Sequence, residues 1–128
     1  MCMIGAWVKK RPEEGKYLGW KVYELKPSGV LCSWATNYRY KSGKVVTRKP
    51  TSHPFKGFHV FRLKQDAREL LPYTRCIIGK ARLSGVVQEH EKGARGEKLE
   101  MLMLELPKER AALAPKLRKR YGVKVRMV

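Results

Sequence analysis

A basic segment with interleaved aromatic residues is the part of this sequence best suited to bind a polyanion. Lys and Arg neutralise phosphates and release condensed counterions, and aromatic rings can stack on unpaired bases. No acidic residue occurs between Glu24 and Asp66. We therefore expect nucleic-acid contact here, with a solvated loop whose aromatic rings return to the core as the alternative. The candidate residues are Tyr38, Arg39, Tyr40, Lys41, Lys44, Arg48, Lys49 and Lys56.

A second basic element lies near the C-terminus, where no acidic residue follows Glu109. Leu113, Leu117 and Tyr121 recur at a spacing of four, which predicts one buried face of a helix. The cations would then project outward and could contact phosphates or an acidic protein groove. A solvated helix face, with cations favoured near its C-terminal end, explains the pattern equally well. The residues concerned are Lys116, Arg118, Lys119 and Arg120.

An acidic cluster, Glu89–His90–Glu91, stands out in this basic chain. A histidine between two carboxylates could act as a general acid or base, or the three could hold a metal. Adjacent residues of a strand point to opposite faces, so three consecutive ligands converge poorly. We expect instead a salt-bridged hairpin of Glu89, Glu91, Arg95 and Glu97, with Gly93 at its tip. No glycine-rich phosphate loop or nucleophile elbow occurs, so we predict no catalytic residue, metal or cofactor.

The net charge of the protein also favours an anionic partner. The 128 residues carry 29 Lys and Arg against 11 Asp and Glu, a formal net charge of +18. Like charges on a compact body repel one another, so an anionic partner is the expected reason for the excess. Nucleic acid is the first candidate, an acidic protein or nucleoprotein the second and an anionic membrane the third. No apolar run reaches the roughly 20 residues that span a bilayer, and the sequence lacks the order of a secretory signal, so we expect a cytoplasmic protein and no membrane.

Apolar residues recur mainly with a period of two, so most of the elements that position these residues are expected to be strands. Strands are predicted over residues 16–25, 29–35, 57–63, 75–87 and 99–106, with a final one at 123–127. Gly79 and Gly85 indicate a bend or bulge in the fourth of these. Helices are predicted over residues 64–71 and about 108–121, and residues 37–56 as an exposed basic loop or hairpin. The fold class is α+β in a single domain, residues 1–128: a β-rich curled sheet or small open barrel with one or two short helices.

Three segments support a resemblance to a known family. Residues 79–97 read GKARLSGVVQEHEKGARGE, which resembles the pattern G-x-V-x-L-x-G-x-V-x-E-H-E-x-G-x-R-x-E of small uncharacterised proteins of bacteria and their phages. Residues 57–61 and 120–123 look like that family's G-I-H/Y-A-F strand and closing R-Y-G-V element. The resemblance implies a phage or mobile-element origin. Many members carry cysteines where Phe55 and Lys56 stand here, so no metal role is carried over.

Together these features predict a non-enzymatic nucleic-acid-binding module. A protein-interaction inhibitor of a host nuclease or defence nucleoprotein is the alternative. A small metal-dependent nuclease that uses His90 with Glu89 or Glu91 is the third reading. The sequence leaves open DNA or RNA, single or double strand, and the oligomeric state.

Overall fold

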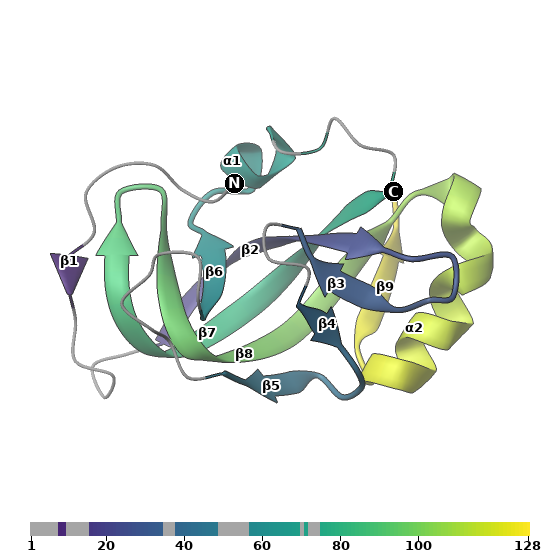
Figure 1. The fold of residues 1–128 in the computed structure, drawn as a ribbon. Coiled ribbons are helices and arrows are strands. Elements are labelled where there is room, and N and C mark those ends of the chain that lie inside the picture. The colour runs from purple at the N-terminus through teal and green to yellow at the C-terminus, as the bar shows by residue number, and fades with distance from the viewer. Residues whose placement is uncertain (1–7, 10–15, 35–37, 49–56, 70, 72–74) are drawn as a thin grey trace.

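The structure is a computed structural model that describes residues 8–9, 16–34, 38–48, 57–69, 71 and 75–128 (Figure 1). The described elements are strands, two short α-helices and one 3-10 helix. In chain order they are β1 (Val8–Lys9), β2 (Lys16–Leu25), β3 (Leu31–Ser33), β4 (Arg39–Tyr40), β5 (Val45–Thr47), β6 (Phe58–Phe61), α1 (Lys64–Arg68), β7 (Cys76–His90), β8 (Gly93–Leu106), η2 (Lys108–Leu113), α2 (Ala114–Tyr121) and β9 (Lys124–Met127).

The strands form one strongly curled sheet. β2 pairs with β7, β7 with β8, β8 with β6 and β6 with β2, all antiparallel, so these four strands close a ring. β3 and β4 extend the sheet beyond β2, while β5 and β9 add to β8, the latter in parallel. The predicted α+β class, with a curled sheet and two short helices, is confirmed.

Glycine allows the strands of the ring to approach closely. A Cβ atom at Gly79 would lie 2.8 Å from both Leu104 Cδ2 and Met103 O on the neighbouring β8. The β7–β8 register shifts after Lys80 and again after Val86, and Gly85 between these points has a φ of +62°. The predicted bulge in the strand of Gly79 and Gly85 is therefore confirmed, and it provides the curvature.

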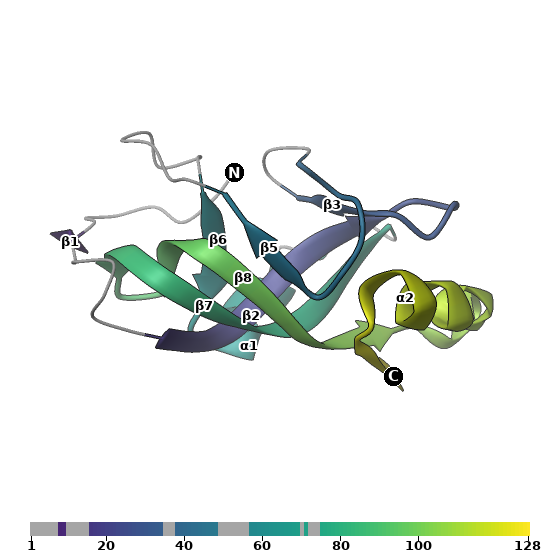
Figure 2. The ribbon, with the colours of Figure 1, turned by 90° about the horizontal axis from the view of Figure 1, so that it is seen from below.

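The main apolar core lies between the sheet and α2. Its largest fully buried side chains include Tyr23, Tyr40, Phe58 and Tyr121. A smaller apolar cluster joins Ala67 of α1 to Val22 of β2 and to Cys76 and Ile78 of β7. In both views η2 and α2 lie at one end of the sheet, and α1 lies away from that end (Figures 1 and 2).

Two predicted segments differ from the structure. The described part of residues 37–56 is not simply a loop, because it contains β4 and β5, which pair with β3 and β8. Such pairing depends on distant partners, so local composition does not reveal it. The helix predicted at about 108–121 is divided into η2 and α2, with a non-helical φ of −114° at Arg110. The helix predicted at 64–71 is α-helical over Lys64–Arg68.

Candidate nucleic-acid interface

Helix α2 presents its cations to solvent. Ala114, Leu117 and Tyr121 form its single buried stripe. Pro115 lies in the first turn, where a missing N–H is tolerated, and Gly122 closes the helix with a φ of +62°. The predicted outward position of the four cations is confirmed, because Lys116, Arg118, Lys119 and Arg120 are all exposed.

Strand β4 and the turn that follows it supply the second group of exposed cations, with Arg39 in β4 and Lys41 and Lys44 in the turn. Both ends of β5 are fixed to β8. The Met101 N–H donates to the Lys44 carbonyl at 2.7 Å, and the Arg48 N–H donates to the Glu97 carbonyl at 2.7 Å. The backbone that carries Lys44 is therefore held by the sheet.

One hydrogen bond joins the two basic segments. The Gly43 N–H in the β4–β5 turn donates to the carbonyl of Arg120, near the end of α2, at 2.9 Å. Gly43 has a φ of +81°, a conformation that glycine adopts without steric cost. The turn and the helix lie side by side in both views (Figures 1 and 2). We use the name basic face for the exposed cations of these two adjoining segments, which are Arg39, Lys41, Lys44, Lys116, Arg118, Lys119 and Arg120.

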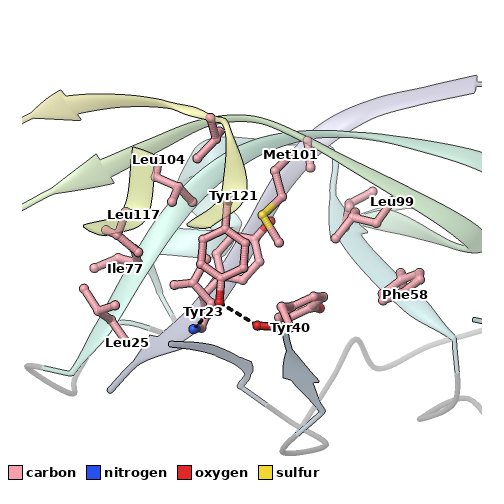
Figure 3. Close-up of a cluster of buried hydrophobic side chains, with 14 of the residues drawn as sticks. Tyr23, Leu25, Tyr40, Phe58, Ile77, Leu99, Met101, Leu104, Leu117 and Tyr121 are labelled. Carbon is pink, nitrogen blue, oxygen red and sulfur yellow. Dashed lines mark hydrogen bonds between the residues drawn. The ribbon is translucent and has the colours of Figure 1, made fainter. Parts of the chain in front are cut away.

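Tyr121, the last residue of α2, makes two hydrogen bonds to the backbone of neighbouring strands (Figure 3). Its hydroxyl accepts a hydrogen bond from the Leu31 N–H at 2.8 Å and donates one to the Tyr40 carbonyl at 2.6 Å. The side chain is fully buried, and burial raises the pKa of this phenol. The last residue of α2 is thus bonded to β3 and β4 at once, which fixes the helix relative to the turn.

The aromatic residues that the structure describes in the basic segment do not form an open stacking surface. Tyr40 is 1% exposed, and burial raises the pKa of its phenol. The prediction that it contacts nucleic acid is wrong, because side chains alternate along β4: Arg39 points outward and Tyr40 into the core. Tyr38 is half-buried, with ring centroids 5.2 Å from Tyr40 and 5.8 Å from Phe58, and the Arg48 guanidinium lies 4.7 Å from its ring.

Acidic partners neutralise cations elsewhere in the protein but not on this face. Lys64 pairs with Glu105, Arg82 with Glu100 at 3.0 Å and Lys26 with Glu24 at 3.1 Å. Within the described residues, no ion pair involves a cation of the basic face. The exposed acidic residues of that part of the chain are Glu69, Glu91 and Glu109, at the end of α1, in the β7–β8 turn and in η2. The basic face is therefore electropositive and accessible.

The Glu89–His90–Glu91 cluster lies at the β7–β8 turn. The Lys92 N–H donates to His90 Nδ1 at 3.2 Å. Over the described ranges, no group of three or more His, Cys, Asp or Glu residues could hold a metal ion. Two details of the predicted hairpin are wrong. Its turn is formed by Glu91 and Lys92 rather than centred on Gly93.

The second wrong detail is the surface position expected for Arg95. This residue lies opposite His59 of β6 and Gln88 of β7, in the middle of three paired strands, and only 2% of its surface is exposed. Burial lowers the pKa of its guanidinium. Arg95 is therefore buried within the sheet and not exposed at the surface of the hairpin.

Not every predicted site residue can be placed. Lys49 and Lys56 lie outside the described residues. Two residues that build the face were not predicted: Gly43, whose N–H joins turn to helix, and Tyr121, whose hydroxyl joins helix to strands. The Ser42–Gly43 pair is a turn signal, but nothing in it identifies Arg120 as the partner.

Comparisons with known proteins add no relative. A scan against protein-family models, a search of curated proteins and a search of solved structures each found no match. In the part of the chain covered by the structure, no helix has the length and apolar character needed to cross a membrane.

Proposed function

We propose that this protein is a non-enzymatic nucleic-acid-binding module whose basic face contacts the phosphate backbone. The observation that carries the proposal is the hydrogen bond between Gly43 and Arg120. It places two acid-free basic segments, far apart in the sequence, on one surface. With this proposal go a cytoplasmic location and the phage or mobile-element origin implied by the sequence resemblance.

Phosphate contact is favoured over base contact by the side chains that are accessible. The exposed residues of the basic face are Lys and Arg, and their contacts to phosphates position a protein on nucleic acid without reading its sequence. Such binding is driven by counterion release and weakens steeply with salt. Because no ion pair forms on this face among the residues that the structure describes, no internal carboxylate competes with a phosphate for its cations.

The test removes charge from the basic face and measures binding as a function of salt. The variant combines Lys41→Gln, Lys44→Gln, Arg118→Gln and Arg120→Gln, all at exposed positions. Fluorescence anisotropy with labelled DNA and RNA gives the slope of log K against log salt. Because each neutralised phosphate contributes a slope of about −0.9 on duplex DNA, loss of all four contacts lowers its magnitude by about 3 to 4.

The matched control combines Lys16→Gln, Arg68→Gln, Arg75→Gln and Lys92→Gln, exposed residues outside the basic face. It makes the same change in net charge, so any difference between the two variants is due to position. Equal losses in both variants would refute the proposal. So would wild-type protein that binds no nucleic acid and retains a stoichiometric protein partner from nuclease-treated lysate, the result expected of a defence inhibitor.

A further inference from the structure

We infer, on the basis of the proposed function, that the protein binds B-form duplex DNA, with α2 in the major groove and the β4–β5 turn on the phosphates at the groove's edge. The ligand is thus narrowed from nucleic acid in general to one duplex form. Three features of the basic face lead to this assignment.

The first feature is the position of the aromatic rings. Proteins that hold single strands combine a basic groove with rings on which bases stack, each worth about 1–3 kcal/mol. Every aromatic residue in the described part of this chain is buried or half-buried. Tyr38, the one nearest the surface of the basic segment, has its ring covered by Arg48 and packed edge-on against Tyr40 and Phe58. Among the described residues, a single strand would therefore find no fully exposed ring on which its bases could stack.

The second feature is the charge density of the ligand. Duplex DNA carries a phosphate charge for about every 1.7 Å of its axis, and counterion release per contact is larger than on a single strand. The cations of the basic face are carried by a helix and a turn whose backbones are fixed to each other by the Gly43–Arg120 hydrogen bond. A fixed array of cations matches the regular phosphate rows of a duplex better than a flexible chain.

The third feature is the shape and position of α2. Its eight residues make a helix about 12 Å long, and a helix with side chains is about 10–12 Å wide, close to the width of the major groove of B-DNA. Only one stripe of α2 is buried, and the helix lies at the end of the molecule in both views (Figures 1 and 2). The exposed side is therefore free to enter a groove.

The cations of α2 are arranged to reach both walls of that groove. Successive helical residues are about 100° apart, so Arg118 and Arg120 lie on opposite sides of Lys119. With Lys119 toward the groove floor, the two arginines face the two phosphate rows. The major groove of duplex RNA is deep and narrow and does not admit a helix, which selects DNA.

The experiment compares three labelled probes of one sequence at one salt concentration: duplex DNA of about 20 base pairs, nearly two helical turns, the equivalent RNA duplex and the single DNA strand. We expect the dissociation constant for duplex DNA to be at least about tenfold below the other two. Arg118→Gln with Arg120→Gln reduces that preference, whereas Lys41→Gln with Lys44→Gln weakens binding to both duplexes in similar proportion. Methyl green, a major-groove ligand, competes with the protein, and netropsin, a minor-groove ligand, does not.

The outcomes separate this inference from the proposed function. Binding to none of the probes refutes both. Equal affinity for DNA and RNA duplexes, or competition by netropsin but not by methyl green, overturns groove entry and leaves phosphate binding intact. Tighter binding to the single strand, with quenching of a 2-aminopurine base in that strand, overturns the duplex assignment by showing that a base stacks on an aromatic ring.

Discussion

The basic face and the region around α1 hold cations in opposite ways. Near α1, Lys64 pairs with the buried Glu105 and lies 4.9 Å from the Trp20 ring. On the adjacent sheet surface Arg82 pairs with Glu100. Among the described residues of the basic face no cation has such a partner. Charge that is paired contributes to the fold, and charge that is unpaired and exposed is available to a ligand.

The two regions also differ in what holds their helices. Helix α1 packs through Ala67 onto an apolar cluster that contains Val22 and Ile78. Helix α2 adds hydrogen bonds to its apolar contacts, through the Tyr121 hydroxyl and the Arg120 carbonyl. Helix α1 is also joined to β8, through the Lys64–Glu105 pair. The two helices therefore differ in the groups that hold them: a lysine side chain for α1, and a backbone carbonyl and a buried phenol for α2.

The largest expected effect is a loss of folding stability at alkaline pH, caused by the buried tyrosines beneath the basic face. Burial raises the pKa of Tyr23, Tyr40 and Tyr121, which all belong to the core beneath the basic face. A phenol with a raised folded-state pKa stabilises the protein below its unfolded pKa near 10, and this stability is lost as pH rises above that value. The free energy of unfolding should therefore fall as pH rises above about 10, by up to about 1.4 kcal/mol per pH unit for each phenol that stays protonated in the folded state.

Tyrosinate absorbance near 295 nm and far-UV circular dichroism, recorded in one alkaline titration, test this expectation. The three buried tyrosines should ionise together with the loss of structure. Ionisation of all tyrosines near their ordinary pKa, with the circular dichroism unchanged, would contradict it.

A smaller effect is expected from the substitution Tyr121→Phe. It removes the hydroxyl that bonds the buried Leu31 N–H and the Tyr40 carbonyl, so both backbone groups lose a partner. The expected loss is about 1–3 kcal/mol in the free energy of unfolding, measured by urea denaturation.

Tyr23→Phe is the matched control for that substitution. Tyr23 is equally buried, but in the described structure its hydroxyl has no hydrogen-bond partner. Its removal should therefore leave stability unchanged or raise it. Equal losses in the two variants would show that the Tyr121 bonds contribute nothing specific.

The smallest expected effect on stability concerns single surface charges. Arg82→Gln breaks an exposed ion pair and should change the free energy of unfolding by no more than about 0.5 kcal/mol. Lys44→Gln, at an exposed position on the basic face, should change stability as little. Only Lys44→Gln should weaken DNA binding, by about fivefold to tenfold at 0.1 M salt, if it removes one phosphate contact. Equal affinities for the two variants would erase the distinction between paired and unpaired cations.

The strands with strong local patterns were predictable. The alternation and aromatic content of residues 16–25 match β2, and the predicted strand 57–63 contains β6. The predicted strand 99–106 matches only the second part of β8, which begins at Gly93. The outward cations of α2 were also predictable, since a spacing of four between Leu117 and Tyr121 defines the buried side of a helix. In each case the pattern that predicts the element lies in residues close together in the sequence.

The burial of particular polar and aromatic residues was not predictable. The sequence leaves open whether the Tyr40 ring is exposed or returns to the core, and it predicts a surface position for Arg95, yet only 1% and 2% of their surfaces are exposed. Each owes its position to distant strands: Tyr40 lies opposite Leu31, and Arg95 lies between Gln88 and His59. No local window contains these partners.

Sequence alone determined the excess of positive charge, the acid-free segments that carry it and the periodicities of strands and helix, because these are properties of consecutive residues. The tertiary structure decided which cations are paired, which rings are covered and that the turn at Gly43 meets the end of α2. Those outcomes depend on contacts between segments far apart in the chain, and such contacts form only when the sheet curls and the core closes around Tyr121.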